Sequence, residues 1–315
     1  MTVNANPVVE TATVGDANRL REPAGKAREV EGIYRAPGLH WVGDGFRVAG
    51  YFSAIPDAVH KLDPFLLLDY HPEYDYSPTS KRRGVGVHPH RGFETVTFAF
   101  QGSVAHHDSA GGGGVIGPGD VQWMTAASGI LHKEYHEESY SRRGGPFQMV
   151  QLWVNLPRAH KLSPPRYQPI TSARIGVATL ANGSGTVRVI AGEFAGVRGP
   201  AMTFTPINIY DARLSARGQV DFSFPARETA ALLVMKGEVA INGASKAQEN
   251  DFVLFKNAGE RISIVASSDA QLLVLNGVPI AEPIVQHGPF VMNTEQEIRE
   301  AFADFSRGKF GYLED

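Results

Sequence analysis

Short apolar runs recur along the first half of the chain, from about Ile33 to Gln168. Each run is four to seven residues long, and Gly, Pro, Asp and Asn separate one run from the next. None of them keeps the period of about 3.6 residues that marks an amphipathic helix. Closely spaced short strands with turn residues between them predict a β-sandwich or a small β-barrel. The clearest predicted strands are Phe65–Leu68, Glu94–Phe100, Val121–Met124 and Met149–Val154.

The region from about Tyr167 to Leu275 has the same pattern. Its Asn242-Gly243 dipeptide is typical of a tight two-residue hairpin, in which both central residues need positive φ. The proline-rich stretch Leu162–Pro165 comes before this region, and we interpret it as a linker. The pattern therefore predicts two β domains of similar size, although no residue-level repeat supports a duplication. The predicted strands of the second domain are Val187–Ile190, Phe204–Tyr210, Ala230–Met235, Phe252–Phe255 and Leu272–Leu275.

One helix is predicted near the C-terminal end. Thr294 and Glu297 have the spacing of a capping box, in which each side chain satisfies a free amide at the helix start. Apolar residues then repeat at helical spacing as far as Phe305, and Gly308 is a typical stop signal. We expect this short helix to cover a sheet or a domain junction.

These elements predict an all-β protein made of two domains. We expect a flexible N-terminal tail over residues 1–31 and a first domain over residues 32–165. The second domain is expected over residues 166–315, with the C-terminal helix as part of it.

Composition narrows the chemistry. The chain of 315 residues has no cysteine, which excludes disulfides, iron–sulfur clusters and thiolate metal sites. Any metal must therefore be held by imidazole nitrogen and carboxylate oxygen. The formal net charge of -3 predicts no direct binding to nucleic acid and no attraction to an anionic membrane. We expect a cytoplasmic protein, because the chain shows neither a membrane-spanning apolar stretch nor a secretory signal.

The histidines are distributed unevenly. Ten of the eleven lie between His40 and His160, and none occurs from Lys161 to Gln286. If both domains are barrels of one kind, only the first can hold a metal through histidine. The second would then be a structural copy without metal ligands.

The His88-Pro89-His90 stretch leads into a predicted strand. Side chains alternate faces along a strand, so His88, His90 and Glu94 share one face if no bulge intervenes. Two imidazoles that are two residues apart can reach one metal ion. The same face continues into apolar residues, which predicts a metal site at the mouth of an apolar pocket. These predicted pocket residues are Val96, Phe98 and Phe100.

A second pair follows downstream at His132 and Glu134, which also share a strand face. Glycine-rich turns separate the two pairs, so the chain has room to return to the same site. Three histidines and a carboxylate with open positions suit iron(II) or a similar divalent ion. An isolated His-x-His is more often structural, but the neighbouring carboxylates favour a metal site here.

Other polar residues are weaker candidates. His106-His107-Asp108 precedes the Gly111–Gly114 run, so we interpret it as an exposed hairpin end rather than a relay. His136 is interpreted as a surface residue with a lesser chance of lining the pocket rim. Trp123 and Trp153 are most simply core residues, and the residues beside Trp123 face the opposite side from it. The Gly111–Gly114 run lacks the Lys-Ser/Thr of a phosphate-binding loop.

Four segments resemble the pirin family of the cupin superfamily. Residues 88–96, with the sequence HPHRGFETV, look like the family signature. The segment 119–134 and the segment 151–157 are similar to the two that follow in pirins. Glu282-Pro283-Ile284 with Gly288-Pro289-Phe290 resembles the closing segment of the second domain. The resemblance covers roughly residues 32–305 and implies two cupin-type jelly-roll barrels with iron in the first barrel only.

Carried over by motif, the resemblance implies that His88, His90, His132 and Glu134 are the metal ligands. Glu94 stands where many cupins keep a carboxylate ligand, and the resemblance to pirins implies that it lies in the pocket beside the metal ligands rather than among them. Pirins include proteins assigned as quercetin 2,3-dioxygenases, so the implied reaction opens a flavonol with O₂ and releases carbon monoxide. Fe(II) is the expected metal, and Glu134 is the candidate base for the substrate hydroxyl.

Two other functions stay open at this point. The resemblance also implies a redox-responsive regulatory protein that binds a transcription factor or a metabolic enzyme. In that case Lys81-Arg82-Arg83 is a candidate part of the docking surface, although a solvated loop is the simpler interpretation. A third possibility is a cupin isomerase or small-acid enzyme that uses zinc, manganese or nickel, since the ligand types allow these ions.

Overall fold

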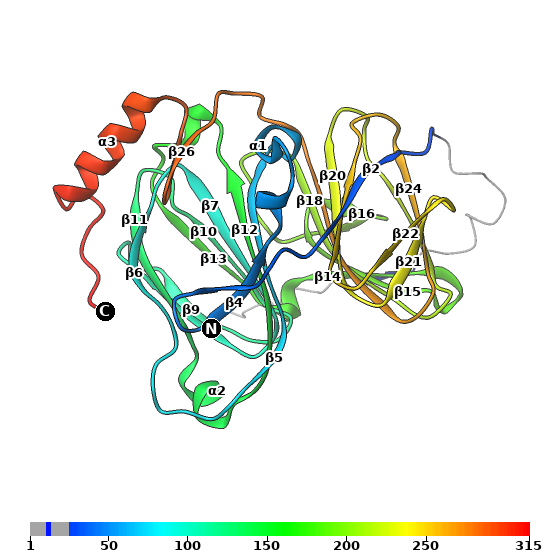
Figure 1. The fold of residues 1–315 in the computed structure, drawn as a ribbon, viewed down its shortest axis with the longest axis horizontal. Coiled ribbons are helices and arrows are strands. Elements are labelled where there is room, and N and C mark those ends of the chain that lie inside the picture. The colour runs from blue at the N-terminus through cyan, green and yellow to red at the C-terminus, as the bar shows by residue number, and fades with distance from the viewer. Residues whose placement is uncertain (1–10, 14–24) are drawn as a thin grey trace, which may run out of the picture. The chain divides into compact units, whose positions relative to one another are not determined.

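The computed structural model describes residues 11–13 and 25–315 of the chain. The chain divides into two compact units, each of which combines segments that are distant in sequence (Figure 1). The first unit comprises Ala36–Pro169 and Val278–Asp315. The second comprises Ile170–Gly277 together with the described residues up to Arg35. We call these units the first barrel and the second barrel.

Two antiparallel sheets enclose the interior of the first barrel. The seven-stranded sheet has the order β13-β10-β7-β12-β5-β4-β3, and the four-stranded sheet has the order β6-β11-β8-β9. Apolar side chains from both sheets meet between them, including Ala99, Val104 and Phe147. The strands of the larger sheet are β3 (His40–Val42), β4 (Phe46–Gly50), β5 (Phe65–Tyr76), β7 (Phe93–Gln101), β10 (Val121–Thr125), β12 (Gly145–Asn155) and β13 (Arg166–Ile170). Those of the smaller sheet are β6 (Gly84–His90), β8 (Val104–Asp108), β9 (Gly113–Ile116) and β11 (Ile130–His136).

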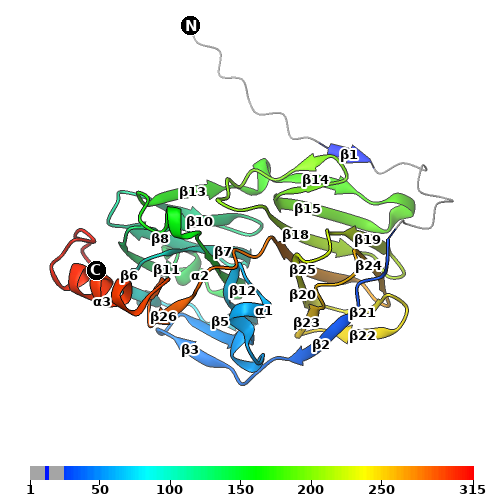
Figure 2. The same cartoon turned by 90° about the horizontal axis from the view of Figure 1, so that it is seen from above.

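The second barrel has an eight-stranded sheet with the order β1-β14-β15-β18-β25-β20-β23-β2 and a four-stranded sheet with the order β19-β24-β21-β22. Its interior is filled with apolar side chains, among them Tyr210, Phe222 and Phe224. In Figure 2, β1 runs beside β14 at the edge of the larger sheet. The larger sheet contains β1 (Thr11–Thr13), β2 (Val30–Arg35), β14 (Gly176–Thr179), β15 (Gly185–Ala191), β18 (Ile207–Leu214), β20 (Thr229–Lys236), β23 (Asp251–Phe255) and β25 (Ala270–Gly277). The smaller contains β19 (Gln219–Ser223), β21 (Glu238–Ile241), β22 (Ser245–Gln248) and β24 (Arg261–Ala266).

The remaining elements are short. The helices are α1 (Ala58–Lys61), α2 (Glu138–Arg143) and α3 (Glu295–Ser306), and single 3₁₀ turns are η2 (Tyr51–Ala54), η3 (Arg158–His160), η4 (Ser172–Arg174) and η5 (Ala181–Gly183). Two small hairpins pair β16 (Glu193–Phe194) with β17 (Val197–Arg198) and β26 (Val285–His287) with β27 (Phe290–Met292). Among the described residues, no helix combines the length and apolarity needed to cross a membrane.

The prediction of an all-β protein with two cupin-type barrels and a short C-terminal helix is confirmed. Each predicted strand lies in or overlaps an observed one. The hairpin at Asn242-Gly243 has positive φ at both residues, as expected, but its loop also includes Ala244 because Ile241 pairs with Ser245.

The observed units differ from the expected domain boundaries at both ends. The strand β2 pairs with β23 and so belongs to the second barrel, although the first domain was expected to begin at residue 32. Within the expected tail, Arg28 is fully buried and donates hydrogen bonds to the carbonyls of Glu228 and Pro225 at 2.7 Å each. Residues 1–10 and 14–24 of the predicted tail lie outside the described residues.

The Leu162–Pro165 stretch is not the boundary between the units. It precedes β13, which pairs with β10 in the first barrel. The C-terminal segment also returns to the first barrel, where Phe290, Ile298 and Phe310 pack around Leu131 of β11. A buried ammonium group fixes this return, because Lys161 Nζ donates to the carbonyl oxygens of Gly92, at 2.8 Å, and Val291, at 3.0 Å.

The helix α3 begins as the capping pattern predicts. The Thr294 hydroxyl accepts a hydrogen bond from the Glu297 amide at 3.2 Å. The Glu297 carboxylate accepts from the Asn293 amide rather than from that of Thr294. Ile298 and Ala301 form the buried face of the helix. The helix lies beside β26 in Figure 1 and covers part of the first barrel.

Candidate metal centre

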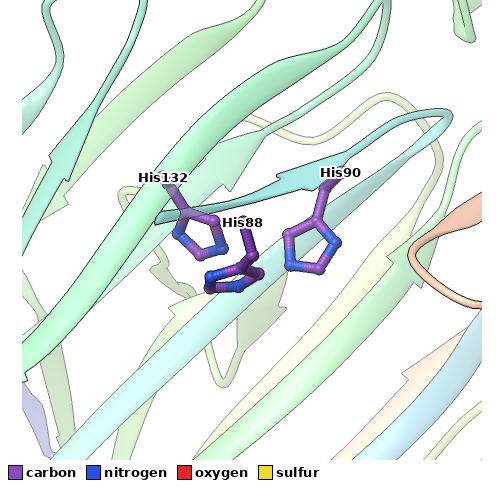
Figure 3. A group of neighbouring side chains, drawn as sticks. All are labelled: His88, His90 and His132. Atoms are coloured by element: carbon purple, nitrogen blue, oxygen red, sulfur yellow. The ribbon is translucent and has the colours of Figure 1, made fainter. Parts of the chain in front are cut away.

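Three histidine rings converge inside the first barrel (Figure 3). His88 and His90 lie on β6, and His132 lies directly across from His88 on the neighbouring strand β11. Ring centroids are separated by 4.2 Å between His88 and His132 and by 4.8 Å between His90 and His132. One ligand atom from each ring can be chosen so that all lie within 4.8 Å of one another. Strand alternation and strand pairing thus bring the three predicted histidines to one point.

Hydrogen bonds leave the Nε2 atom of each ring available. The Nδ1 of His88 lies 2.8 Å from the Gly86 carbonyl, and the Nδ1 of His90 lies 3.4 Å from the Pro289 carbonyl. A carbonyl only accepts, so both Nδ1 atoms carry the proton and both Nε2 atoms are bare. The Nε2 of His132 is buried and has no hydrogen-bond partner. Burial, followed by the repulsion that a protonated His88 would exert, holds the pKa of His132 well below its ordinary value, so this ring is neutral near pH 7.

The carboxylate of Glu134 is the fourth predicted ligand. Glu134 is buried on the same face of β11 as His132, and it forms a second compact group with His132 and His106. Its Oε1 accepts from the Gln122 amide and from the Thr97 hydroxyl, the latter at 3.1 Å. Its Oε2 accepts from the Gln151 amide at 3.3 Å. Three polar side chains of the larger sheet therefore hold this carboxylate close to His132, whereas His88 and His90 are not in its compact group.

The expected faces of β7 are reversed in the structure. The chain turns between β6 and β7 at Gly92, which has a φ of +89°, so the alternation that begins at His88 does not continue into β7. Thr97 reaches Glu134, which shows that the odd-numbered positions of β7 face the site. The predicted pocket residues therefore lie on the opposite face. They are Glu94, Val96, Phe98 and Phe100.

Glu94 is buried among neighbours other than the predicted ligands. Its carboxylate accepts a hydrogen bond from the Thr125 hydroxyl at 2.6 Å, and Thr125 is its pairing partner on β10. Burial raises the pKa of Glu94 to about 7. The side chain is thus neither a ligand nor a partner of the ligands, and its carboxyl group is easily protonated.

Sequence reasoning missed several side chains at the site. His106 is fully buried with its Nδ1 3.4 Å from the Nδ1 of His132, so the expectation of an exposed hairpin end is wrong for this residue. Thr97, Gln122 and Gln151 hold Glu134. The available signal was Gln122 beside a core tryptophan, because that residue must face the other way. It could not be used without knowing which face of the strand is the interior.

Two further residues differ from their expected roles. His136 is neither on the surface nor at a pocket rim: it is buried, it stacks on Phe147 at 4.5 Å, and burial lowers its pKa to about 4. Trp123 is a core residue, as predicted. Trp153 is only partly buried, and its ring lies 5.2 Å from the ring of His90.

The residues present fit a divalent metal ion. The bare, buried Nε2 of His132 is an uncompensated polar atom, which a metal would satisfy. Neutral imidazoles and a carboxylate are the ligands that iron, zinc, manganese and nickel accept. Among the described residues, clusters of potential ligands occur only in the first barrel, whereas the second barrel is filled by its apolar core.

Comparison with known proteins places this site in a family. The Pirin family profile matches residues 45–154, and the profile of the Pirin C-terminal cupin domain matches residues 209–311. A Pseudomonas aeruginosa protein named as a candidate quercetin 2,3-dioxygenase is 49% identical over 283 residues, which are 90% of this chain and 98% of that protein. Pirin-1 of Arabidopsis thaliana is 38% identical, over 80% of this chain and 84% of its own length.

A solved structure agrees with both sequence and fold. The crystal structure of quercetin 2,3-dioxygenase from Acinetobacter baumannii has a TM-score of 0.88 and 46% identity to this chain. The match covers 92% of this chain and 100% of that one. The four histidine and glutamate positions first noticed by their spacing lie within the segment that the Pirin profile covers. The chain belongs to the pirin family.

Proposed function

We propose that this chain is a metal-dependent flavonol dioxygenase of the quercetin 2,3-dioxygenase type, with His88, His90, His132 and Glu134 as ligands of Fe(II). The observation that carries the proposal is the convergence of three imidazoles. Two of them are anchored through Nδ1, and the Nε2 of the third is buried without a hydrogen-bond partner. The names of the Pseudomonas and Acinetobacter relatives support the substrate class. Because the chain has no cysteine, the ligand set contains only nitrogen and oxygen donors.

A divalent ion at this point supplies Lewis acidity, which lowers the pKa of a bound hydroxyl group. The residues of the chain supply the rest. Glu134 forms a compact group with His132 and His106, and it is the candidate acceptor for the proton of the flavonol 3-hydroxyl. Gln151 and Gln122 orient that carboxylate through their amide groups. The partly exposed ring of Trp153 beside His90 offers an apolar face to a flat aromatic ligand.

Turnover of quercetin tests the proposal. Protein loaded with Fe(II) should bleach quercetin in the presence of O₂ and release carbon monoxide. We expect His88→Ala and Glu134→Gln each to lower kcat/KM by a factor of 100 or more, on the order of 3 kcal/mol of transition-state stabilisation. His60→Ala is the control, because His60 is exposed and paired with Asp57. Metal-replete wild-type protein that leaves quercetin unchanged under O₂ would contradict the proposal.

The identity of the metal is a separate question. Elemental analysis of protein purified without chelator should show iron as the main transition metal. Zinc, manganese or nickel at one equivalent would instead favour another divalent ion, and with it the isomerase or small-acid enzymes among cupins.

A second candidate function is a redox-responsive regulatory protein, and one observation favours it. Lys133 alternates with His132 and Glu134 along β11, so its side chain lies on the outer face of the strand that carries two ligands. There it lines a hollow of about 550 Å³ together with Lys81 and Arg82. Oxidation from Fe(II) to Fe(III) would add one charge close to this basic surface. An acidic protein partner is the class that such a surface fits.

Copurification separates the two candidates. A partner that binds the Fe(III) form more tightly than the Fe(II) form, and that is lost in Lys133→Gln, would favour the regulatory function if quercetin turnover is absent. Equal binding to both oxidation states would contradict it.

A further inference from the structure

A chain of three buried side chains runs outward from the candidate metal centre. Asp108 and His106 lie on β8, directly across from His132 and Glu134 of β11. Asp108 Oδ2 lies 3.3 Å from His106 Nε2, and His106 Nδ1 lies 3.4 Å from His132 Nδ1. Both His106 and His132 are fully buried. Neither Asp108 nor His106 belongs to the proposed ligand set.

The direction of the hydrogen bonds in this chain follows from its outer end. A carboxylate only accepts, so the proton on His106 lies on Nε2 and points to Asp108. A neutral His106 then has a bare Nδ1, which accepts from His132. The proton of His132 must therefore lie on Nδ1, and its Nε2 is bare. The Nε2 of His132 has no hydrogen-bond partner, so nothing within hydrogen-bond distance opposes this tautomer.

Asp108 is itself held so that it can only accept. Its Oδ1 receives hydrogen bonds from the backbone amides of Ala110 and Gly112, at 2.9 and 2.8 Å. These bonds fix the carboxylate and leave Oδ2 to face His106. Glycine at position 112 leaves room for this carboxylate, because a Cβ there would lie 2.3 Å from Asp108 Oδ2 and 2.8 Å from Tyr167 Cβ. The glycine-rich run thus has a structural purpose unrelated to phosphate binding.

Tyr167 supports both sides of the centre. Its ring stacks on His106 with 4.9 Å between centroids and 15° between planes. Its hydroxyl donates to the Gln122 carbonyl oxygen at 3.2 Å, which turns the Gln122 amide nitrogen toward Glu134. The same tyrosine therefore holds the ring of His106 in place and fixes the amide that orients Glu134.

We propose that Asp108 and His106 are positioning residues that hold His132 in the tautomer with a bare Nε2, ready to bind a metal ion. This inference rests on the proposed metal centre. Outer partners of ligating histidines typically contribute about a factor of 10 to 100 in metal affinity. The arrangement is a carboxylate–histidine–histidine series. The turn that holds Asp108 sets the donor and acceptor direction of each hydrogen bond, and this direction fixes the tautomer of the buried ligand His132.

An isosteric substitution tests the direction of these hydrogen bonds. In Asp108→Asn the backbone amides keep the side-chain oxygen, so the Asn NH₂ group faces His106 Nε2 and donates to it. His106 must then carry its proton on Nδ1, and His132 is driven to the Nε2-protonated tautomer, which cannot bind a metal through Nε2 until the proton moves. We expect the dissociation constant for Co(II), measured by titrating metal-free protein, to rise at least 10-fold. Asp120→Asn is the matched control, because Asp120 also accepts from a turn amide, that of Gly117.

A second pair of variants separates positioning from packing. His106→Gln retains an acceptor for His132 and a donor for Asp108, so its Co(II) affinity should stay within about threefold of wild type. His106→Leu removes both and should lose at least 10-fold. This pair also decides the question if Asp108→Asn does not fold. Equal Co(II) affinities in His106→Gln and His106→Leu, or in Asp108→Asn and Asp120→Asn, would overturn the proposal.

The tautomer of His132 gives a readout that needs no metal. Two-bond ¹H–¹⁵N correlation spectra of metal-free protein should show His132 protonated at Nδ1 in the wild type and at Nε2 in Asp108→Asn. An unchanged tautomer would overturn the inference. If the tautomer changes between wild type and Asp108→Asn but the wild type binds no Co(II), only the proposed metal function is contradicted. Failure of this inference can therefore be distinguished from failure of the proposed function.

Discussion

Three buried carboxyl groups of the first barrel show that environment decides what each can do. Glu134 receives hydrogen bonds from three polar side chains and lies close to His132 and His106. Burial of Asp108 tends to raise the pKa of its carboxyl group. Hydrogen bonds from His106 and from two backbone amides outweigh this effect, so the pKa lies below its ordinary value. Glu94 has one hydroxyl donor, and burial raises its pKa to about 7. Residue type alone does not distinguish these three environments.

Glu94 should therefore make stability depend on pH. Its pKa is about 7 in the folded protein and near 4.5 when unfolded, so the folded state binds more protons between these values. Stability from this group is fully present below pH 4.5 and is lost as the pH rises through 7. The loss is at most about 3 kcal/mol. Glu94→Gln removes this pH dependence. The free energy of unfolding of the variant, relative to that of wild type, should therefore rise by about 2 to 3 kcal/mol from pH 5 to pH 8.

Urea denaturation of metal-free protein at the two pH values measures this difference. Glu249→Gln controls for the loss of a carboxylate on the surface, since Glu249 is exposed. A stability difference between Glu94→Gln and wild type that is the same at pH 5 and pH 8 would show that Glu94 is ionised throughout this range.

At the scale of elements, the pairing of strands β6, β11 and β8 builds the site. Spacing along one strand was enough to select His88 with His90 and His132 with Glu134, because alternation is a local property. His106 was not selected, since its relation to His132 depends on the register between β8 and β11. Gln122 and Gln151 were missed for the same reason, as they reach Glu134 across the barrel from another sheet.

Gly92 explains the one prediction about faces that was wrong. The interpretation of residues 88–100 as one strand assumed continuous alternation, but Gly92 ends β6 and directs the chain into the other sheet. A Cβ on this residue would lie 1.9 Å from the Val291 carbonyl oxygen, and its φ is in the range that favours glycine. The turn at this single glycine therefore leaves Glu94 on the face of β7 that points away from the ligands.

Substitution of Gly92 should be much more costly than the backbone angle alone predicts. In Gly92→Ala the positive φ contributes about 1 to 2 kcal/mol of strain, and the overlap with Val291 adds to it. We expect a total loss of at least about 3 kcal/mol in the free energy of unfolding. Gly243→Ala is the matched control, because Gly243 has a φ of +67° and nothing within 4 Å of the added Cβ.

Chemical denaturation of both variants gives the comparison, and Co(II) titration shows whether the ligands remain aligned. Gly92→Ala should also weaken Co(II) binding, since this residue follows His90 by two positions. Equal losses of stability in the two variants would show that the close approach to Val291 relaxes freely.

At the scale of the whole molecule, each barrel is completed by a segment from the far end of the chain. The strand β2 completes the second barrel, and residues 278–315 complete the first. The sequence pattern predicted these elements but assigned them to their neighbours in sequence, because periodicity shows which residues are buried and not against what. Long-range contacts such as that between Lys161 and Val291 have no local signature.

The division into two barrels predicts which strands a bound metal ion stabilises. An ion present at 100 times its dissociation constant stabilises the state that binds it by about 2.7 kcal/mol, equivalent to a factor of about 100 in local opening. Only openings that disrupt the ligands are suppressed. Hydrogen–deuterium exchange should therefore slow by up to about 100-fold in β6 and β11. It should also slow in residues 290–292, because the carbonyl of the preceding Pro289 holds His90. Strands of the second barrel, such as β20 and β25, should exchange at an unchanged rate, as should all segments in a His88→Ala–His90→Ala double variant.

Equal protection of both barrels on adding the metal would show that they open as one cooperative unit, despite the absence of a ligand cluster among the described residues of the second.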